Sequence, residues 1–328
     1  MTIAVEYKEV TEEECGMRLD RWFKSHYEQL PFGYLQKLLR SGQVRVNGKR
    51  AKSDMRLLLG QIIRVPPLPS LAQPPNLLTM RKLHEKDYFA LKQMLLYEDE
   101  KLFVLNKPAG LAVQGGSGIK RHIDGMLASY VQKNGEKPRL VHRLDRETSG
   151  VLVVARSRSA ARSLAQAFRQ REIKKRYWAL VRGAPQKKEG KISNFLVKEP
   201  GPEGDRVRVC SKSVVGSEHA ISYYRVLEQC SSILSWLEME PYTGRTHQLR
   251  VHAAALLHPI IGDAKYFEEV ENWHLPQGMQ NKLHLHARSI ELPHPSGGVL
   301  RIVAPLPPHM VQSFNLFGFV YDKEGKNE

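Results

Sequence analysis

The hydrophobic positions near the start of the chain predict two short helices followed by a hairpin. Apolar residues recur three and four positions apart over residues 19–23 and again over residues 34–39, and Gly42 follows as a stop signal. Residues 44–50, VRVNGKR, alternate apolar and basic positions up to an Asn-Gly pair, which is a strong hairpin signal. We therefore expect a small domain over residues 15–66.

This pattern ends in a proline-rich stretch. The segment PPLPSLAQPP at residues 66–75 contains five prolines, and proline does not fit the interior of a helix or a sheet. Such a composition is typical of a connection between domains. We interpret residues 67–95 as a linker.

Downstream, short β-type runs outnumber the helical ones, which we place at residues 120–133, 158–170 and 245–257. Several strand-like runs follow one another without an intervening helix, which favours an α+β fold with a mixed, mainly antiparallel sheet over a doubly wound fold. We expect this larger domain over residues 96–310 and a C-terminal tail over residues 311–328. The expected strands are KLFVLNK, GVLVVAR, KRYWALVRG, SILSWLEME, LHLHARSIEL and GVLRIVAP.

The charge of the chain indicates a polyanionic partner. Its 328 residues include 50 Lys and Arg against 34 Asp and Glu, a formal net charge of +16. Residues 15–66 alone carry eleven basic and three acidic side chains, which is about half of that excess. Nucleic acid is the leading partner class. No apolar run approaches the length of a membrane span and the N-terminus is too acidic for a leader peptide, so we expect no membrane and a cytoplasmic protein.

No metal or disulfide site is expected. The three cysteines show neither paired spacing nor a metal-ligand pattern. His284 and His286 alternate on an expected strand without a third ligand at suitable spacing, which favours core histidines. His247 and His252 are expected to be structural or to face RNA. The glycine-rich run QGGSG at 114–118 has no Gly-Lys-Ser/Thr after it and does not predict a nucleotide site.

Residues 140–150, LVHRLDRETSG, place Asp145 between Arg143 and Arg146 in a loop that leads into an expected strand. Such a loop holds side chains firmly while leaving them accessible. An ordinary turn with a surface ion pair explains the same residues, and such pairs are common and weak. From these residues alone the two interpretations are equally supported.

The run HRLDRETSG resembles the catalytic loop of the RluA-type pseudouridine synthases, whose pattern is His-Arg-Leu-Asp-x-x-Thr-Ser-Gly. Five further stretches resemble the motifs of that family in the same order. They are VLNKPAGLAVQGG, KKRYWALVRG, YTGRTHQLRVH, HPIIGDAKYF and LHLHARSIELPHP, and with the catalytic loop they span residues 96–306. The helix–helix–hairpin order of residues 15–66 resembles the S4-type RNA-binding domain that many members carry, although PFGYLQKLL departs from the usual Ser-Arg-Ser before its second helix.

The resemblance implies a reaction and a set of catalytic residues. Pseudouridine formation breaks the N-glycosidic bond, turns the base and rejoins it through carbon, with no net oxidation and no cofactor. Asp145 would be the catalytic carboxylate, Arg245 its charged partner and Tyr177 the residue against the target base. Leu249 would cover the base from the other side, and Arg143 would fill the stack that the base leaves. In the S4-like domain, the RNA-binding candidates are Lys37, Arg40, Arg45, Lys49 and Arg50.

The expected substrate is large-subunit (23S) ribosomal RNA. The stretches GLAVQGGSG and YEDEKLFVLNKPAG are closer to the C type of large-subunit enzyme than to the D type. A D-type enzyme, a dual transfer-RNA and ribosomal-RNA enzyme, and a non-catalytic RNA-binding ribosome-assembly factor stay open as alternatives. We expect the protein to act as a monomer.

Overall fold

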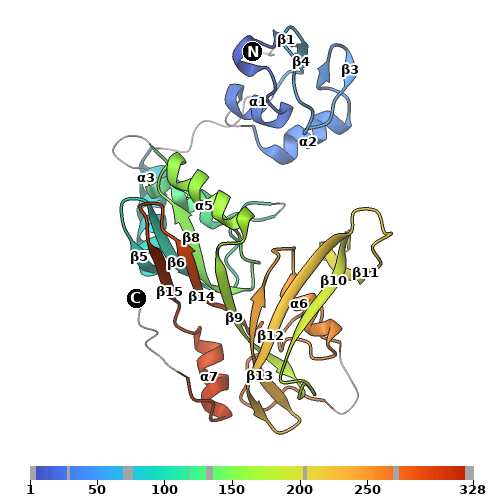
Figure 1. The fold of residues 1–328 in the computed structure, drawn as a ribbon. Coiled ribbons are helices and arrows are strands. Elements are labelled where there is room, and N and C mark those ends of the chain that lie inside the picture. The colour runs from blue at the N-terminus through green and yellow to red at the C-terminus, as the bar shows by residue number, and fades with distance from the viewer. Residues whose placement is uncertain are drawn as a thin grey trace. The chain divides into compact units, whose positions relative to one another are not determined.

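The chain folds as two units, Met1–Lys82 and Leu83–Glu328 (Figure 1). The computed structural model describes residues 5–27, 30–68, 77–116, 118–130, 136–201, 205–268 and 273–321, and over residues 77–84 it describes the backbone alone. Each unit is built around hydrophobic clusters of its own.

The first unit contains the two helices and the hairpin that the sequence predicts. α1 (Leu19–His26) and α2 (Phe32–Arg40) bury their apolar stripes in one core. Asn47 and Gly48 turn the chain with positive φ angles of 47° and 74°, values that a tight hairpin turn requires. The four-stranded sheet has the order β1-β4-β2-β3. Its strands are β1 (Glu6–Glu9), β2 (Arg45–Val46), β3 (Lys49–Arg50) and β4 (Ile62–Val65).

The predicted start of the first domain and the predicted linker both need correction. β1 pairs antiparallel with β4, so the first unit begins before residue 15; β1 is short and charged, and only its pairing marks it as a strand. The predicted linker 67–95 contains α3 (Leu77–Gln93), within which the two units divide. After the last proline the sequence has no helix breaker, and Leu91 is buried in the second unit. Residues 69–76 lie outside the described residues.

The second unit is built on one 11-stranded sheet of order β11-β10-β12-β13-β9-β14-β8-β6-β5, with β15 beside β14 and β7 beside β8. Among the described pairs only β14 with β8 is parallel. The predicted α+β class with a mixed, mainly antiparallel sheet is confirmed. The strands are β5 (Leu95–Glu98), β6 (Leu102–Lys107), β7 (Arg139–Leu140), β8 (Ser149–Ala155), β9 (Lys174–Arg182), β10 (Glu189–Glu199), β11 (Arg206–Cys210), β12 (Glu218–Cys230), β13 (Leu234–Pro241), β14 (Leu285–Pro293) and β15 (Val299–Val303).

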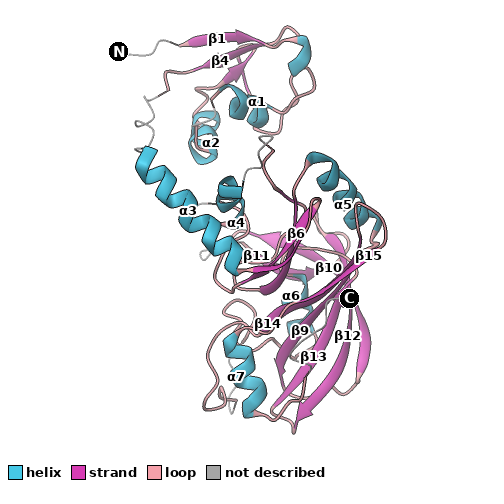
Figure 2. Ribbon diagram, turned by 90° about the vertical axis from the view of Figure 1, so that its left-hand side faces the viewer, coloured by secondary structure: helices cyan, strands magenta, loops and turns pink. Residues whose placement is uncertain are grey.

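Helices cover both faces of this sheet (Figure 2). Neighbouring residues on a strand point to opposite faces. On β8, Val151 packs with α5 whereas Leu152 packs with α3 and α4; on β9, Ala179 packs with α6 whereas Leu180 packs with α7. Besides α3, the helices of this unit are α4 (Ile123–Met126), the 3-10 helix η2 (Leu127–Tyr130), α5 (Arg158–Gln170), α6 (Gln248–Ala255) and α7 (Pro308–Leu316).

The prediction of a C-terminal tail from residue 311 is wrong for its first part. α7 crosses that limit, and Phe314 is fully buried against Trp236 and Trp178. Phe319 after the helix is buried in the same cluster. The apolar residues of this segment provide the reason, because α7 covers one face of β9 and β13. Residues 322–328 lie outside the described residues.

Candidate active site

Residues 141–148 connect β7 to β8 and carry Asp145. The N–H of Thr148 donates to the carbonyl of Asp145 at 3.2 Å, which closes the turn. At the end of the loop Gly150 has a φ of 110°, and a Cβ there would overlap the backbone of Ala287 on β14. Because only glycine permits this approach, the Thr-Ser-Gly end of the motif fixes where the loop joins the sheet.

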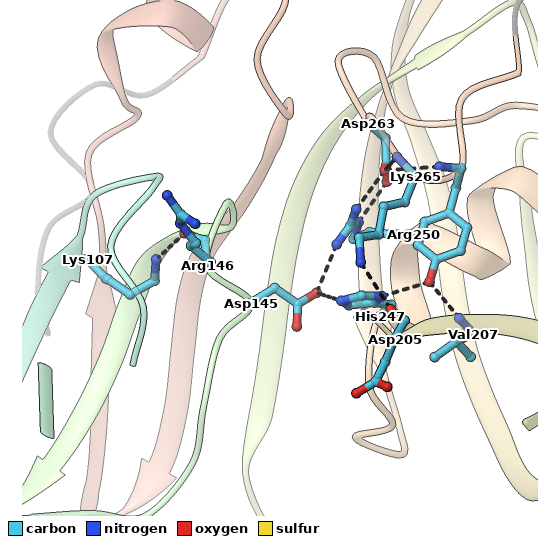
Figure 3. Close-up of polar contacts among 10 residues, drawn as sticks. Lys107, Asp145, Arg146, Asp205, Val207, His247, Arg250, Asp263 and Lys265 are labelled. Atoms are coloured by element: carbon cyan, nitrogen blue, oxygen red, sulfur yellow. Dashed lines mark hydrogen bonds and ion pairs between the residues drawn. The ribbon is translucent and has the colours of Figure 1, made fainter. Parts of the chain in front are cut away.

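A buried lysine ties the loop to β6 (Figure 3). The Nζ of Lys107 donates to the carbonyls of Pro108 at 2.9 Å, Leu111 at 2.8 Å and Arg146 at 3.0 Å. Lys107 is 0% exposed, and this burial lowers its pKa to about 7. The residue that follows Asp145 is thus bonded to the last residue of β6.

Asp145 lines a cleft of about 990 Å³ between the C-terminal part of α5, the start of β9 and the start of α6. Its side chain is 20% exposed. Four residues that the sequence placed near Asp145 line the same cleft, namely Arg143, Tyr177, Arg245 and Leu249. A carboxylate, an aromatic ring, an aliphatic side chain and a cation therefore border one space.

The predicted pairing of Arg245 with Asp145 is wrong. Arg245 Nη1 lies 2.6 Å from Glu218, and its Nε donates to the carbonyl of His219 at 3.3 Å. The arginine beside the catalytic candidate is Arg250, whose Nη1 is 3.6 Å from Asp145 Oδ2. The reason is geometric: Arg245 precedes α6 and is exposed, whereas Arg250 lies on the buried side of that helix.

Arg250 is held by a second carboxylate. Its Nε and Nη2 each lie 2.7 Å from an oxygen of Asp263, a bidentate pair. The side chains of Asp263 and Arg250 are 0% and 7% exposed. Asp263 Oδ1 also accepts from the N–H groups of Lys265 and Tyr266. Two oxygens of Asp263 thus fix the plane of the guanidinium, leaving Nη1 directed at Asp145.

His247 is the second group beside the carboxylate. Its Nε2 lies 3.9 Å from Asp145 Oδ2, and its Nδ1 is 2.7 Å from the hydroxyl of Tyr266. Burial lowers the pKa of His247, although the charge of Asp145 opposes that shift. A neutral imidazole therefore lies between Tyr266 and Asp145.

Tyr177 and Leu249 form an apolar part of the cleft. Tyr177 comes from β9, and Leu249 from the first turn of α6 is 6% exposed. Both belong to the cluster under α6. Burial raises the pKa of Tyr177, and the negative charge of Asp145 raises it further, so its hydroxyl keeps its proton at neutral pH.

Basic side chains border the cleft on the α5 side. Arg143 is exposed at the loop, and Arg169 and Arg171 line the cleft from the end of α5. The guanidinium of Arg171 lies 4.5 Å from the ring centre of Tyr242, a cation–π contact. The border is suited to a polyanion.

The basic candidates of the first unit lie on α2 and on the β2–β3 hairpin. Among the described residues none of these five makes an ion pair with a carboxylate, and Arg45 donates instead to the carbonyls of Gly42 and Gly48. The charge of this surface is therefore uncompensated locally. The five are Lys37, Arg40, Arg45, Lys49 and Arg50.

Within the described ranges, no group of histidine, cysteine and acidic side chains could hold a metal ion. His284 and His286 are fully buried, as predicted for core histidines. His284 bonds Ser313, and His286 bonds Ser149. In that same part of the chain, no helix is both long and apolar enough to cross a membrane.

The sequence interpretation missed Arg250, Asp263, Tyr266 and Lys107 as parts of the site. All four lie inside motifs that the interpretation had singled out, namely TGRTHQLR, HPIIGDAKYF and VLNKPAG. The available signal was the helical phase after Arg245, because a residue five positions on lies on another face of the helix. Nothing in the sequence alone connects Asp263 to Arg250.

Comparisons with known proteins point to one family. Residues 101–255 match the family described as RNA pseudouridylate synthase. The chain is 37% identical over 94% of its length to ribosomal large subunit pseudouridine synthase C of Pasteurella multocida, covering 92% of that protein, and 36% identical over 93% of its length to the Escherichia coli protein of the same name, covering 94% of it. Among solved structures, human RNA pseudouridylate synthase domain containing 4 has a TM-score of 0.61 and 29% identity, covering 73% of this chain and 98% of that one. The chain therefore belongs to the RluA family of pseudouridine synthases, enzymes that isomerise uridine to pseudouridine in RNA.

Proposed function

We propose that this protein isomerises specific uridines of large-subunit (23S) ribosomal RNA, with Asp145 as the catalytic residue and without a metal or cofactor. The names of the relatives, which match nearly the whole chain, support the substrate. The single observation that carries the chemistry is the cleft in which Asp145 lies beside Arg250 and among Tyr177 and Leu249. The protein acts as a monomer in this proposal, since one chain supplies all of these groups.

The reaction needs a carboxylate held against the nucleoside. The N-glycosidic bond breaks, the uracil turns, and a ring carbon of the base bonds to the same sugar carbon. That ring carbon loses a proton and the freed ring nitrogen takes one up, so no atom is gained or lost overall. Asp145 assists the departure of uracil in this scheme. A cation beside a partly buried carboxylate stabilises its charge, and Arg250 Nη1 lies 3.6 Å from Asp145 Oδ2.

The remaining cleft residues have roles in binding the nucleoside. Tyr177 lies against the base with its hydroxyl protonated, and Leu249 packs on the other side of the base. A uridine in a helical stack must leave it before chemistry, at a cost of a few kcal/mol. Arg143 is exposed beside Asp145 and fills the space that the base leaves.

The first unit supplies affinity for RNA as an S4-like domain. Its two helices and hairpin carry Lys37, Arg40, Arg45, Lys49 and Arg50, which have no carboxylate partner among the described residues. Such cations neutralise phosphates and release counterions. Chemistry is confined to the second unit, where the cleft lies.

The experiment is to map pseudouridines in ribosomal RNA from a strain that lacks the gene, and again after adding back variants. Wild-type protein should restore the lost sites, and Asp145→Asn should not, because the amide cannot carry the charge. Glu147→Gln is the matched control, since Glu147 lies in the same loop with its side chain 52% exposed, and it should restore every site.

Three outcomes contradict the proposal in different ways. Survival of every large-subunit ribosomal-RNA pseudouridine after loss of the gene would exclude this substrate. Lost sites clustered in one stem-loop would favour a D-type enzyme. If loss of the gene impairs ribosome assembly but removes no pseudouridine, and Asp145→Asn restores that assembly, the protein is a non-catalytic assembly factor.

A further inference from the structure

A continuous chain of hydrogen bonds leads from β11 to the cleft. The N–H of Val207 donates to the hydroxyl oxygen of Tyr266 at 3.0 Å, and that hydroxyl lies 2.7 Å from His247 Nδ1. On the other side of the ring, His247 Nε2 lies 3.9 Å from Asp145 Oδ2. Tyr266 is 6% exposed, so its hydroxyl depends on protein partners.

This chain decides which ring nitrogen of His247 carries the proton. A tyrosine hydroxyl has one proton to donate. Its oxygen already accepts from Val207, and among the described residues Nδ1 of His247 is the one acceptor within reach of that proton. Tyr266 therefore donates to Nδ1. Because burial keeps the imidazole neutral, its own proton lies on Nε2 and points toward Asp145.

The two carboxylate oxygens of Asp145 consequently have different neighbours. Arg250 Nη1 at 3.6 Å and His247 Nε2 at 3.9 Å both approach Oδ2. The other oxygen, Oδ1, points away from both side chains (Figure 3). The distance from Nε2 is longer than a hydrogen bond, and such contacts commonly shorten when substrate binds.

The backbone conformation of His247 indicates that its imidazole is held in a specific position. It has a φ of 53° at the residue before α6, in the left-handed region that a side chain with a Cβ rarely adopts. Strained backbone of this kind persists where the surroundings hold it and clusters at functional sites. Here it accompanies the contacts of the imidazole with Tyr266 and Asp145.

We propose that His247 is a positioning residue: as the Nε2–H tautomer set by Tyr266, it engages Oδ2 of Asp145 together with Arg250, and Oδ1 is the oxygen presented to the nucleoside. This inference rests on the proposed function of the cleft. Beyond that function, His247 positions Asp145, Tyr266 sets the tautomer of His247, and the two carboxylate oxygens have different roles.

Two substitutions of His247 separate positioning from packing. His247→Gln places an amide nitrogen near the former Nε2 and can still donate to Asp145. His247→Asn places its amide near the former Nδ1, so it can meet Tyr266 but cannot reach Asp145. In single-site RNA assays with the full chain, kcat of His247→Asn should fall about tenfold or more with KM nearly unchanged, because small displacements of a reacting group are costly. His247→Gln should recover most of that loss.

Nitrogen-15 spectra of the histidine side chains test the tautomer directly. The signal absent from His247→Asn identifies His247, which should be protonated on Nε2 in the wild-type protein. Tyr266→Phe removes the donor to Nδ1, so it should mix the tautomers and lower kcat.

Several results would overturn the inference. One is an Nδ1–H tautomer of His247, and another is an unchanged kcat in His247→Asn. The third is a greater loss of kcat in His247→Gln than in His247→Asn, which is the order expected if the ring only anchors Tyr266. An inactive wild-type enzyme would reject the proposed function and the positioning role together. An active wild type with any of these results would reject the positioning role alone.

Discussion

The two arginines of TGRTHQLR have different surroundings and should have different effects on activity. Arg250 lies between Asp145 and the fully buried Asp263, whereas Arg245 is an exposed partner of Glu218. A surface pair of the latter kind contributes little to stability. A buried pair loses much more when one member is removed, because the other is left without a counter-charge.

Arg250→Ala should therefore abolish isomerisation and lower the free energy of unfolding by about 3–5 kcal/mol. Arg245→Ala, the matched control, should change the free energy of unfolding by less than about 1 kcal/mol and keep most of the turnover. Urea unfolding and single-turnover kinetics measure both quantities. Equal losses in the two variants would show that the pairing described here does not decide activity.

The sequence predicted part of this site and could not predict the rest. Asp145, Tyr177 and Leu249 were identified through motifs, and the structure places all three on one cleft. Arg250 was missed because the helical phase shows only that the two arginines of the motif lie on different faces, and the sequence does not show which face meets Asp145. Asp263 was missed because its partner is thirteen residues away and only the fold brings them together.

At the scale of elements, the loop that carries Asp145 is fixed by contacts at its two ends. At the start of β8, Gly150 allows the backbone of β14 to approach closely. At the end of β6, Lys107 donates a hydrogen bond to the carbonyl of Arg146, the residue after Asp145. Lys107 has a pKa of about 7 in the folded protein, lowered by burial, against about 10.5 for an ordinary lysine. At pH values between these two pKa values, Lys107 is protonated in the unfolded chain but mostly deprotonated in the folded protein.

This difference predicts a pH-dependent stability. Raising the pH from 7 toward 10 should favour the folded state, by at most about 1.4 kcal/mol per pH unit from this group. Lys107→Met cannot titrate, so the free energy of unfolding of the wild type minus that of Lys107→Met should rise over this range. Urea titrations at several pH values measure it. A flat difference would show that the three carbonyls keep Lys107 charged.

Elements with strong local patterns were predicted well, and those defined by long-range pairing were not. The helix at 158–170 agrees with prediction, and so do the six expected strands, which are β6, β8, β9, β13, β14 and β15. α7 was taken for a tail because its apolar residues reveal their partner only when β9 and β13 lie beneath them. β1 is a strand solely through its pairing with β4, which no local pattern encodes.

For the whole molecule, the separation of charge and chemistry between the two units is the dominant feature. Among the described residues, the cations on α2 and the hairpin of the first unit have no carboxylate partner, and the cleft lies in the second unit. Each cation that engages single-stranded backbone steepens the salt dependence of binding by roughly 0.7 in a plot of log affinity against log salt. Affinity and turnover should therefore be separable by substitution.

Replacing Arg45, Lys49 and Arg50 with alanine in the full chain should flatten that slope by about 2, since three contacts are lost. The Michaelis constant should rise while turnover at saturating RNA stays unchanged, because Asp145 and Arg250 belong to the other unit.

The matched control removes three cations that already have carboxylate partners, Arg18 with Asp20, Arg121 with Asp87 and Arg225 with Glu238. A paired cation adds no net charge at its position and displaces few counterions, so this control should leave the slope nearly unchanged. Titrating the three proteins against one RNA at several salt concentrations measures the slopes. Equal slopes for the hairpin variant and the wild type would show that this hairpin does not bind RNA.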